Sequence, residues 1–120
     1  MRLLYLALPA LLLAGGPTAA QAPRPEQRLQ GELLMGGATL VDPPPGEPRD
    51  SHAYFTITGG PARRLFNAMR APVALDVCES GFRMRQQGGL TCRMGPRGRE
   101  PSCAFSIDLR SGGFGPGRPC

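Results

Sequence analysis

Histidine, serine and aspartate occur side by side once in the sequence, at Asp50-Ser51-His52. These are the residue types of a hydrolase triad, in which a histidine base activates a serine nucleophile. Consecutive residues at the start of a strand point in alternating directions, so these three should not converge. His52 is the only histidine, and no second base is available. We therefore expect no catalytic residues and no enzyme activity.

Carboxylates and sulfur ligands give equally little support to catalysis or metal binding. Asp76 and Glu79 could form a carboxylate pair, but they border a cysteine in a predicted turn and are expected to be solvated charges. Met84 and Met94, with His52, could act as soft copper ligands. Alternation places both methionines on the apolar face, where methionine usually fills gaps in a core. We predict no metal and no cofactor.

Four cysteines follow the N-terminal region: Cys78, Cys92, Cys103 and Cys120. No Cys-x-x-Cys pair is present, which argues against a zinc site and against a thioredoxin-like redox site. An even number in a short exported chain indicates two disulfides. The favoured pairing is Cys78 with Cys92 and Cys103 with Cys120. A tight turn at Arg97-Gly98 would instead set Cys92 opposite Cys103 and leave Cys78 for Cys120.

Residues 1–22 have the features of a secretory leader. Arg2 supplies a positive start, residues 3–14 are apolar, and Ala20-Gln21-Ala22 matches a cleavage site. We place the cut after Ala22, with Thr18-Ala19-Ala20 as the alternative. The apolar run reaches about 18 Å as a helix, well short of a hydrocarbon core of about 30 Å. The sequence therefore predicts a periplasmic or secreted protein with no transmembrane segment in the mature chain.

Composition limits what the mature chain can build. About 98 residues remain after cleavage, enough for one small domain. Abundant Gly and Pro leave a small apolar core and exclude a large enzyme, a coiled coil and a two-domain cofactor protein. All 14 basic residues are arginine, and the excess of Arg, Ala, Gly and Pro indicates a GC-rich bacterium. We expect the disulfides to supply much of the stability.

Three segments follow the leader. Residues 23–50 are rich in Pro and Gly and contain a triproline, so we expect partial disorder there. Residues 51–110 carry the patterns of a single α+β domain. Residues 111–120 form a Gly/Pro-rich tail that ends in Cys120.

The strand and helix patterns lie in the middle segment. Residues 53–58 alternate as a strand, and Gly59-Gly60-Pro61 ends that strand and begins a helix that closes at Ala71-Pro72. Alternating segments follow at 82–85, 90–94 and 103–109. We predict a small two-layer α+β domain, stabilised by disulfides, with one helix packed on an antiparallel sheet of about four strands.

Arginines alternate with apolar residues in the predicted hairpins. A three-residue turn at 86–88 would set Met84 opposite Leu90 and place both under the helix. Residues 61–99 hold eight arginines and only two acidic residues. We therefore predict a basic sheet face opposite the helix, extended at a hairpin tip, and made by Arg83, Arg85, Arg93, Arg97 and Arg99.

A one-sided basic surface concentrates anionic partners. We interpret the chain as a non-enzymatic exported bacterial envelope protein that binds an anionic envelope component or a periplasmic protein through this face. Nucleic acid is not expected, because of the leader and because no aromatic residues alternate with the arginines. One alternative is a secreted inhibitor of a lysozyme or protease that acts through Arg97-Gly98-Arg99 or the tail. Another is a structural subunit of an envelope assembly. The remaining interpretation gives the basic face no binding function: it is solvated and keeps the protein soluble. The sequence does not indicate which oligomeric state the protein adopts.

Overall fold

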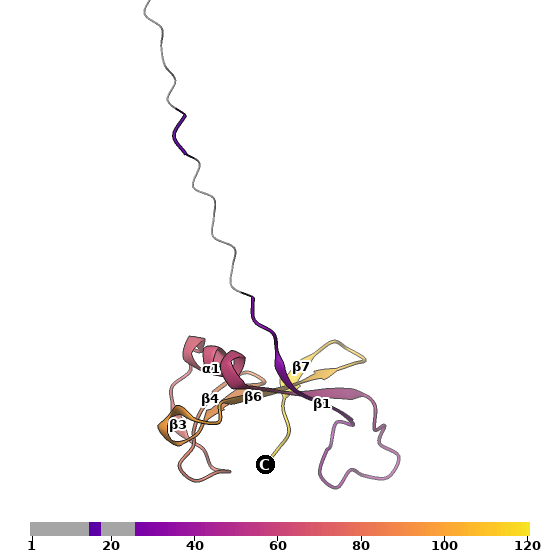
Figure 1. Cartoon of the computed structure of the whole chain (residues 1–120). Coiled ribbons are helices and arrows are strands. Elements are labelled where there is room, and N and C mark those ends of the chain that lie inside the picture. The colour runs from indigo at the N-terminus through magenta and orange to yellow at the C-terminus, as the bar shows by residue number, and fades with distance from the viewer. Residues whose placement is uncertain (1–14, 18–25) are drawn as a thin grey trace, which may run out of the picture.

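The computed structural model describes residues 15–17 and 26–120. The predicted leader and its cut after Ala22 lie outside the described residues, apart from 15–17. One helix packs on one face of an antiparallel sheet (Figure 1), which confirms the predicted α+β class. The sheet has seven strands, so the prediction of about four was too low. Within residues 15–17 and 26–120, no helix is long and apolar enough to cross a membrane.

The strands run in the order β1-β2-β6-β5-β4-β3, and β7 also pairs with β6. The elements are β1 (Gln30–Gly36), β2 (His52–Thr58), α1 (Gly59–Ala68), β3 (Ala74–Leu75), β4 (Arg83–Gln87), β5 (Leu90–Met94), the 3-10 turn η1 (Pro96–Gly98), β6 (Ser102–Asp108) and β7 (Phe114–Pro116).

The central strand β2 forms as predicted, and α1 begins where predicted but ends at Ala68, before the expected end at Ala71-Pro72. Helix α1 includes Pro61 near its start. The first N–H groups of a helix have no acceptor within the helix, so the missing N–H of proline costs no hydrogen bond there. The helix ends when the N–H of Met69 donates to the carbonyl of Leu65. Its buried stripe includes Ala62 and Phe66. This stripe lies on β2, β5 and β6.

A disulfide lies at the centre of the core. Cys92 of β5 and Cys103 of β6 are directly opposite in the strand register and are bonded to each other. The relative exposures of these two residues are only 0% and 1%. The remaining buried members of the cluster are Ala62, Phe66, Met69 and Met94.

The second disulfide joins Cys78 to Cys120, so the favoured pairing of Cys78 with Cys92 and Cys103 with Cys120 is wrong. The reason is geometric. The turn around η1 brings β5 back along β6 and sets Cys92 against Cys103, which leaves the two outer cysteines for each other. The end of the tail is therefore bonded to the loop after β3.

Strand β6 has two neighbours on one edge. Its first half pairs with β5, and its second half pairs with β7, where Phe105 is opposite Pro116. Strand β7 lies within residues 111–120, and β1 lies within residues 23–50. The sheet thus extends into both segments that flank the predicted domain.

The register between β4 and β5 differs from the prediction by three residues, an odd number. Gln87 is opposite Leu90, so the turn is Gly88-Gly89 and not a three-residue turn at 86–88. Gly88 has a φ of 57°, which favours glycine in a two-residue hairpin turn. A Cβ on Gly89 would lie 2.6 Å from the backbone of Gly115 in β7. The slip moves every side chain of β4 to the other face.

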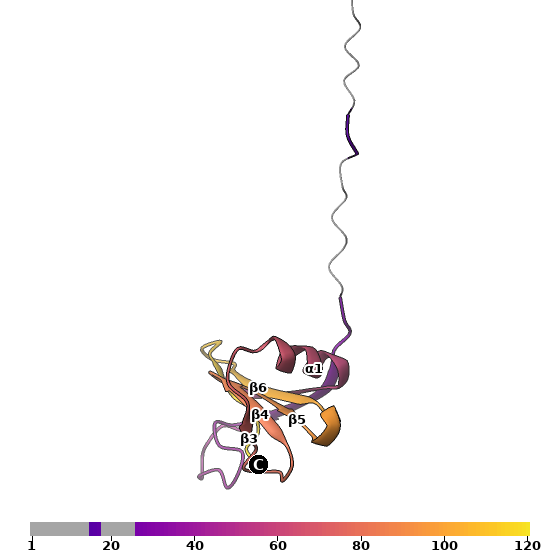
Figure 2. The same cartoon turned by 90° about the vertical axis from the view of Figure 1, so that its left-hand side faces the viewer.

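Loops lie on the sheet face opposite α1. Residues 37–51 lie below β1 and β2, and the C-terminal tail lies beside them, in both views (Figures 1 and 2). The hydroxyl of Tyr54 reaches from β2 and donates a 2.6 Å hydrogen bond to the carbonyl of Gly37. This contact anchors the first residue of the long loop to the sheet.

The buried bridge generates the first prediction. Replacing Cys92 and Cys103 together by alanine should lower the free energy of unfolding by about 3 kcal/mol, because the closed loop no longer restricts the unfolded chain. Urea unfolding of the double variant, monitored by circular dichroism, measures this loss. An unchanged midpoint would show that the bridge does not stabilise the domain.

Candidate functional site

Five exposed arginines gather at one end of the sheet. They come from helix α1, from the start of β4 and from the turn between β5 and β6. Within residues 26–120, none of them forms a salt bridge. We call this group the arginine corner: Arg63, Arg64, Arg83, Arg97 and Arg99.

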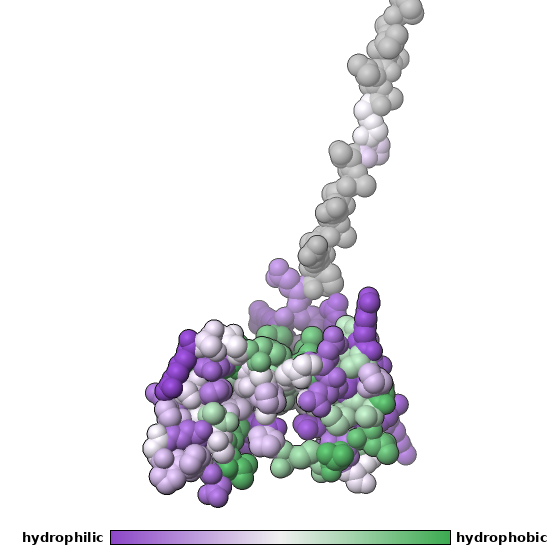
Figure 3. All heavy atoms as spheres, turned by 180° about the vertical axis from the view of Figure 1, so that it is seen from behind, coloured by the Kyte–Doolittle hydropathy of each residue, from purple (hydrophilic) through white to green (hydrophobic). Residues whose placement is uncertain are grey.

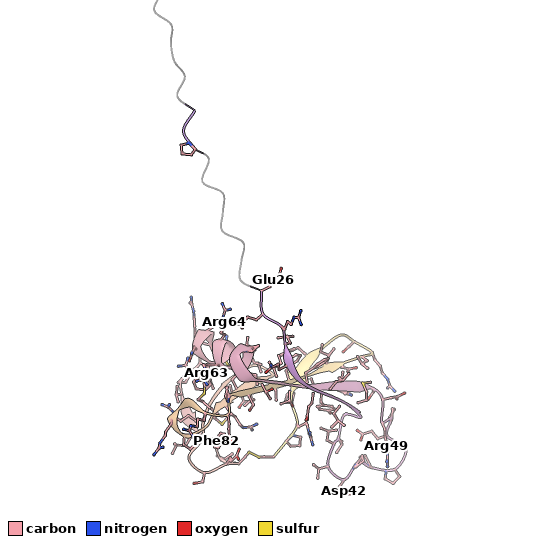
Figure 4. All side chains as sticks on the ribbon, viewed as in Figure 1. Glu26, Asp42, Arg49, Arg63, Arg64 and Phe82 are labelled. Carbon is pink, nitrogen blue, oxygen red and sulfur yellow. A yellow bond between two sulfur atoms is a disulfide. The ribbon has the colours of Figure 1, made fainter. Side chains whose placement is uncertain are left out.

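Short distances place the segments of the corner side by side. A Cβ on Gly98 would lie 3.3 Å from Nη1 of Arg63, so that guanidinium lies against the η1 turn. Arg83 is opposite Met94 at the end of β5, immediately before η1. Arg63 and Arg64 lie at the same end of the molecule as Phe82, while Arg49 lies at the other end (Figure 4).

The η1 turn presents its arginines on a closed backbone. The N–H of Gly95 donates to the carbonyl of Arg99 at 2.7 Å, and the N–H of Gly98 donates to the carbonyl of Gly95 at 3.1 Å. Arg97 has a φ of 59°, a left-handed conformation that a non-glycine residue adopts only when its surroundings impose it. The turn is therefore a preformed support for Arg97 and Arg99.

Arg85 has a structural role and does not belong to the corner. Its guanidinium carbon lies 4.9 Å from the centroid of the Phe66 ring, and its Nη1 donates to the carbonyl of Met69. A cation at this position interacts favourably with the C-terminal end of α1. Arg85 is only partly exposed, because it closes one side of the core.

Arg93 is also occupied inside the protein. Its Nε lies 2.7 Å from Oδ2 of Asp76, whose side chain is fully buried. Neither atom makes an aligned hydrogen bond, so the contact is an ion pair. Nη2 of Arg93 also donates to Sγ of Cys78 at 3.8 Å. Arg93 thus holds the loop after β3 against β5.

The predicted basic sheet face is therefore wrong as a single surface. Arg83 and Arg85 are opposite Met94 and Cys92, so they lie on the α1 face. Arg93 lies on the other face and contacts Asp76. The cause is the two-residue turn, which reverses the faces of β4. Of the five predicted site residues, the structure brings together Arg83, Arg97 and Arg99 and adds two from α1.

The high density of arginine in residues 61–99 was the signal for the corner. The sequence pattern placed Arg63 and Arg64 outside the buried stripe of the helix, and both are exposed. Their proximity to η1 could not be read from the pattern, because it depends on how α1 crosses β5 and β6. Glu79 and Glu100 are exposed near this end and offset part of its charge.

A groove lies on the face opposite α1. It has a volume of about 840 Å³, and Figure 3 shows the hollow from behind. Its floor includes Thr91 and Ser106, and its walls are residues 38–41 and 117–120. Half-buried Met84 also lines the groove. The expectation that both methionines fill the core is therefore wrong for Met84, since the β4 slip turns it away from α1, while Met94 is in the core.

The start of β2 brings serine, histidine and aspartate together. Oγ of Ser51 lies 2.8 Å from Nδ1 of His52, and Nε2 of His52 lies 3.9 Å from Oδ2 of Asp108. The carboxylate beside His52 belongs to Asp108 of β6 and not to Asp50, so the contact does not join the three consecutive residues Asp50, Ser51 and His52. Ser51 is only 8% exposed, however, and a nucleophile must reach its substrate. We assign these contacts to packing at the start of β2.

Asp108 closes the β6–β7 turn. Its Oδ1 accepts a 2.9 Å hydrogen bond from the backbone N–H of Arg110. This bond lowers the pKa of Asp108 below its ordinary value of 3.8, aided by the N–H of Ser111 and by nearby His52 and opposed by partial burial. The charged carboxylate is therefore the form that the folded turn stabilises.

Comparison of the chain with protein-family models, with curated protein sequences and with solved structures finds no match. Within the part of the chain that the structure describes, no group of three or more metal-ligating side chains occurs.

Arg85 and Arg83 form a matched pair for the second prediction. Arg85→Ala should lower the free energy of unfolding by roughly 1 to 2 kcal/mol, because it removes the contact with Phe66 and the hydrogen bond to Met69. Arg83→Ala, at an exposed position two residues earlier, should change it by less than about 0.5 kcal/mol. Equal losses in urea unfolding would contradict the different roles of the two residues.

Asp108 gives a pH-dependent prediction. Asp108→Asn should lower the melting temperature at pH 7, because the folded turn stabilises the charged form. The stabilisation is present above the unfolded pKa and is lost as pH falls through the lowered folded pKa. Thermal melts at stepwise lower pH should therefore show the two proteins converging below pH 3.8. Asp50→Asn, at an exposed carboxylate, is the control, and a gap that persists in acid would refute the assignment.

Proposed function

We propose that the chain is a non-enzymatic exported protein of the bacterial envelope that binds an anionic envelope component or an acidic periplasmic protein through the arginine corner. One observation carries this proposal. Five exposed guanidinium groups from three separate segments meet at one end of the sheet without a salt-bridge partner within residues 26–120. The predicted leader supports a periplasmic or secreted location.

The chemistry of guanidinium favours phosphate and carboxylate partners. It stays charged at any physiological pH and presents a planar set of donors that matches these groups in bidentate geometry. The closed η1 turn fixes the backbone of Arg97 and Arg99 before binding. Less conformational entropy is then lost when a ligand binds.

Phosphate on an envelope surface fits the corner better than nucleic acid. Proteins that bind single strands stack bases on exposed aromatic rings. Phe82, beside the corner, is buried, and its ring lies 3.0 Å from where a Cβ on Gly95 would be. The corner therefore offers charge without a stacking surface.

Charge reversal in the η1 turn tests the proposal. Arg97→Glu combined with Arg99→Glu should weaken binding to phosphatidylglycerol vesicles at least about tenfold at low salt, because an arginine near an anionic surface contributes about 1 kcal/mol. Vesicle flotation over a range of salt concentrations measures this. Binding by the unmodified chain should also fall as salt rises.

A control variant distinguishes binding at the arginine corner from a general effect of the protein's net charge. Arg49→Glu combined with Arg110→Glu makes the same change at exposed arginines outside the corner. It should retain most of the binding. If both double variants lose binding equally, net charge alone is responsible, and the corner is not a site. Salt-insensitive binding by the unmodified chain would also count against the proposal.

A second candidate is a hydrolase inhibitor, and the closed η1 turn favours it. Arg97-Gly98-Arg99 protrudes on a backbone fixed by its own hydrogen bonds and by the left-handed conformation of Arg97. Preformed exposed loops suit the active-site clefts of proteases and lysozymes. Such an inhibitor should act at a one-to-one ratio, and the loss of inhibition in Arg97→Glu would identify the loop. The third alternative, a structural subunit of an envelope assembly, would use a different part of the sheet.

A further inference from the structure

Helix α1 covers only part of its sheet face. Its buried contacts lie on β5 and on the halves of β2 and β6 that carry Ile57 and Cys103. The rest of the same face, over β1 and β7, has no helix above it (Figure 1). In the strand register this uncovered part carries Leu33, Phe55 and Phe105 in one row.

Aromatic rings run across the uncovered part. Phe55 and Phe105 stack with centroids 5.1 Å apart, and Phe105 and Phe114 stack at the same distance. Leu33 is 59% exposed and Met35 is 46% exposed at the edge of this surface. Because monomeric proteins rarely leave a contiguous apolar surface open, the half-covered face points to an interaction partner.

The edge strand β1 borders this surface. Strand β1 pairs with β2 along all seven residues, and no described segment pairs with its other edge. Its backbone groups on that edge are thus open to another strand within the part of the chain that is described. Natural edge strands are usually protected by lysine, proline, bulges or short length. The sequence of β1, QGELLMG, contains neither lysine nor proline and a single charge, at Glu32.

We propose that β1 is a dimerisation strand, which pairs antiparallel with β1 of a second copy of this chain about a two-fold axis at Leu33. A full overlap of Gln30–Gly36 with itself places the axis at the central residue, Leu33. Antiparallel pairing of identical strands is closed and symmetric, so it yields a dimer and not a filament. The two sheets then continue into one another.

The side chains of β1 are complementary in this register. Glu32 is opposite Leu34 of the second copy, so no two like charges meet. Leu33 is opposite its own copy, and Met35 is opposite Gly31, all on the α1 face. The apolar surfaces of the two copies therefore join at the axis, where Leu33 and Met35 lose exposure.

The proposed interface lies away from the arginine corner. Strand β1 is at one end of the strand order, and β4, with Arg83, is near the other. The dimer would therefore carry two free corners at its outer ends. This inference is independent of the proposed anion binding, and either can fail without the other.

The expected dimer is weak. One pair of seven-residue strands buries less than the roughly 800 Å² per partner that stable complexes bury. We therefore expect a monomer–dimer equilibrium with a dissociation constant in the micromolar range or above. Sedimentation velocity of the mature, oxidised chain over a wide concentration range should show a concentration-dependent shift towards the dimer.

Charge placed on the axis tests the geometry. Leu33→Lys sets two lysines side by side in the dimer and should abolish the concentration dependence. Val77→Lys adds the same charge at a side chain that is 93% exposed and distant in strand order, so it should leave the equilibrium unchanged. Mixing Leu33→Lys with Leu33→Glu should restore a heterodimer, because opposite charges then meet.

A cysteine placed on the two-fold axis gives a second test, in which the proposal predicts a gain, the formation of a covalent dimer. Directly opposite residues in antiparallel strands have Cα atoms about 4.5 to 5.5 Å apart, within the range that a disulfide spans. Leu33→Cys should therefore oxidise to a covalent dimer, while Val77→Cys should not. A chain that is monomeric at all concentrations, a dimer that survives Leu33→Lys, or the absence of cross-linking at position 33 would overturn the proposal.

Discussion

The bond between Cys92 and Cys103 is the constraint on which the other features of the structure depend. Few large apolar side chains are buried, and these two sulfur-bearing residues are the most deeply buried of the larger side chains under α1. The bond fixes β5 against the first half of β6, with Cα atoms 4.0 Å apart. The η1 turn is then closed with its arginines outward, and the second half of β6 is left for β7. From β7 the tail runs to the loop that holds Cys78, where Cys120 completes the second bridge.

Sequence reasoning succeeded where local chemistry decides structure. Alternation located β2, and Gly-Gly-Pro located the start of α1, because both signals act within a few residues. It failed in β4, where a tertiary contact between Gly89 and Gly115 helps fix a two-residue turn. That single slip placed Arg85 on the wrong face and kept Met84 in the predicted core. The outer strands β1 and β7 were missed because their side chains are largely exposed and carry little periodic signal.

The two ends of the sheet offer different chemistry. One end carries the arginine corner, where the proposed binding depends on charge and should be sensitive to salt. The other end carries β1 and the half-covered aromatic surface, where the proposed dimer would form by backbone pairing and apolar contact. Between them lies the groove, with one wall formed by the tail that the bond between Cys78 and Cys120 holds in place. The two proposed interactions therefore use different ends of one small sheet.

Hydrogen exchange tests the central role of the buried bridge most directly. In a variant with Cys78→Ser and Cys120→Ser, Cys92–Cys103 is the only disulfide, so reduction reports on it alone. The protein is reduced in denaturant, returned to native buffer with reductant, and compared with the oxidised form by mass spectrometry. We predict that reduction removes the slow exchange of α1, β5 and β6 together, because all three pack around the bridge. Protection that is equal in the oxidised and reduced forms would contradict the account.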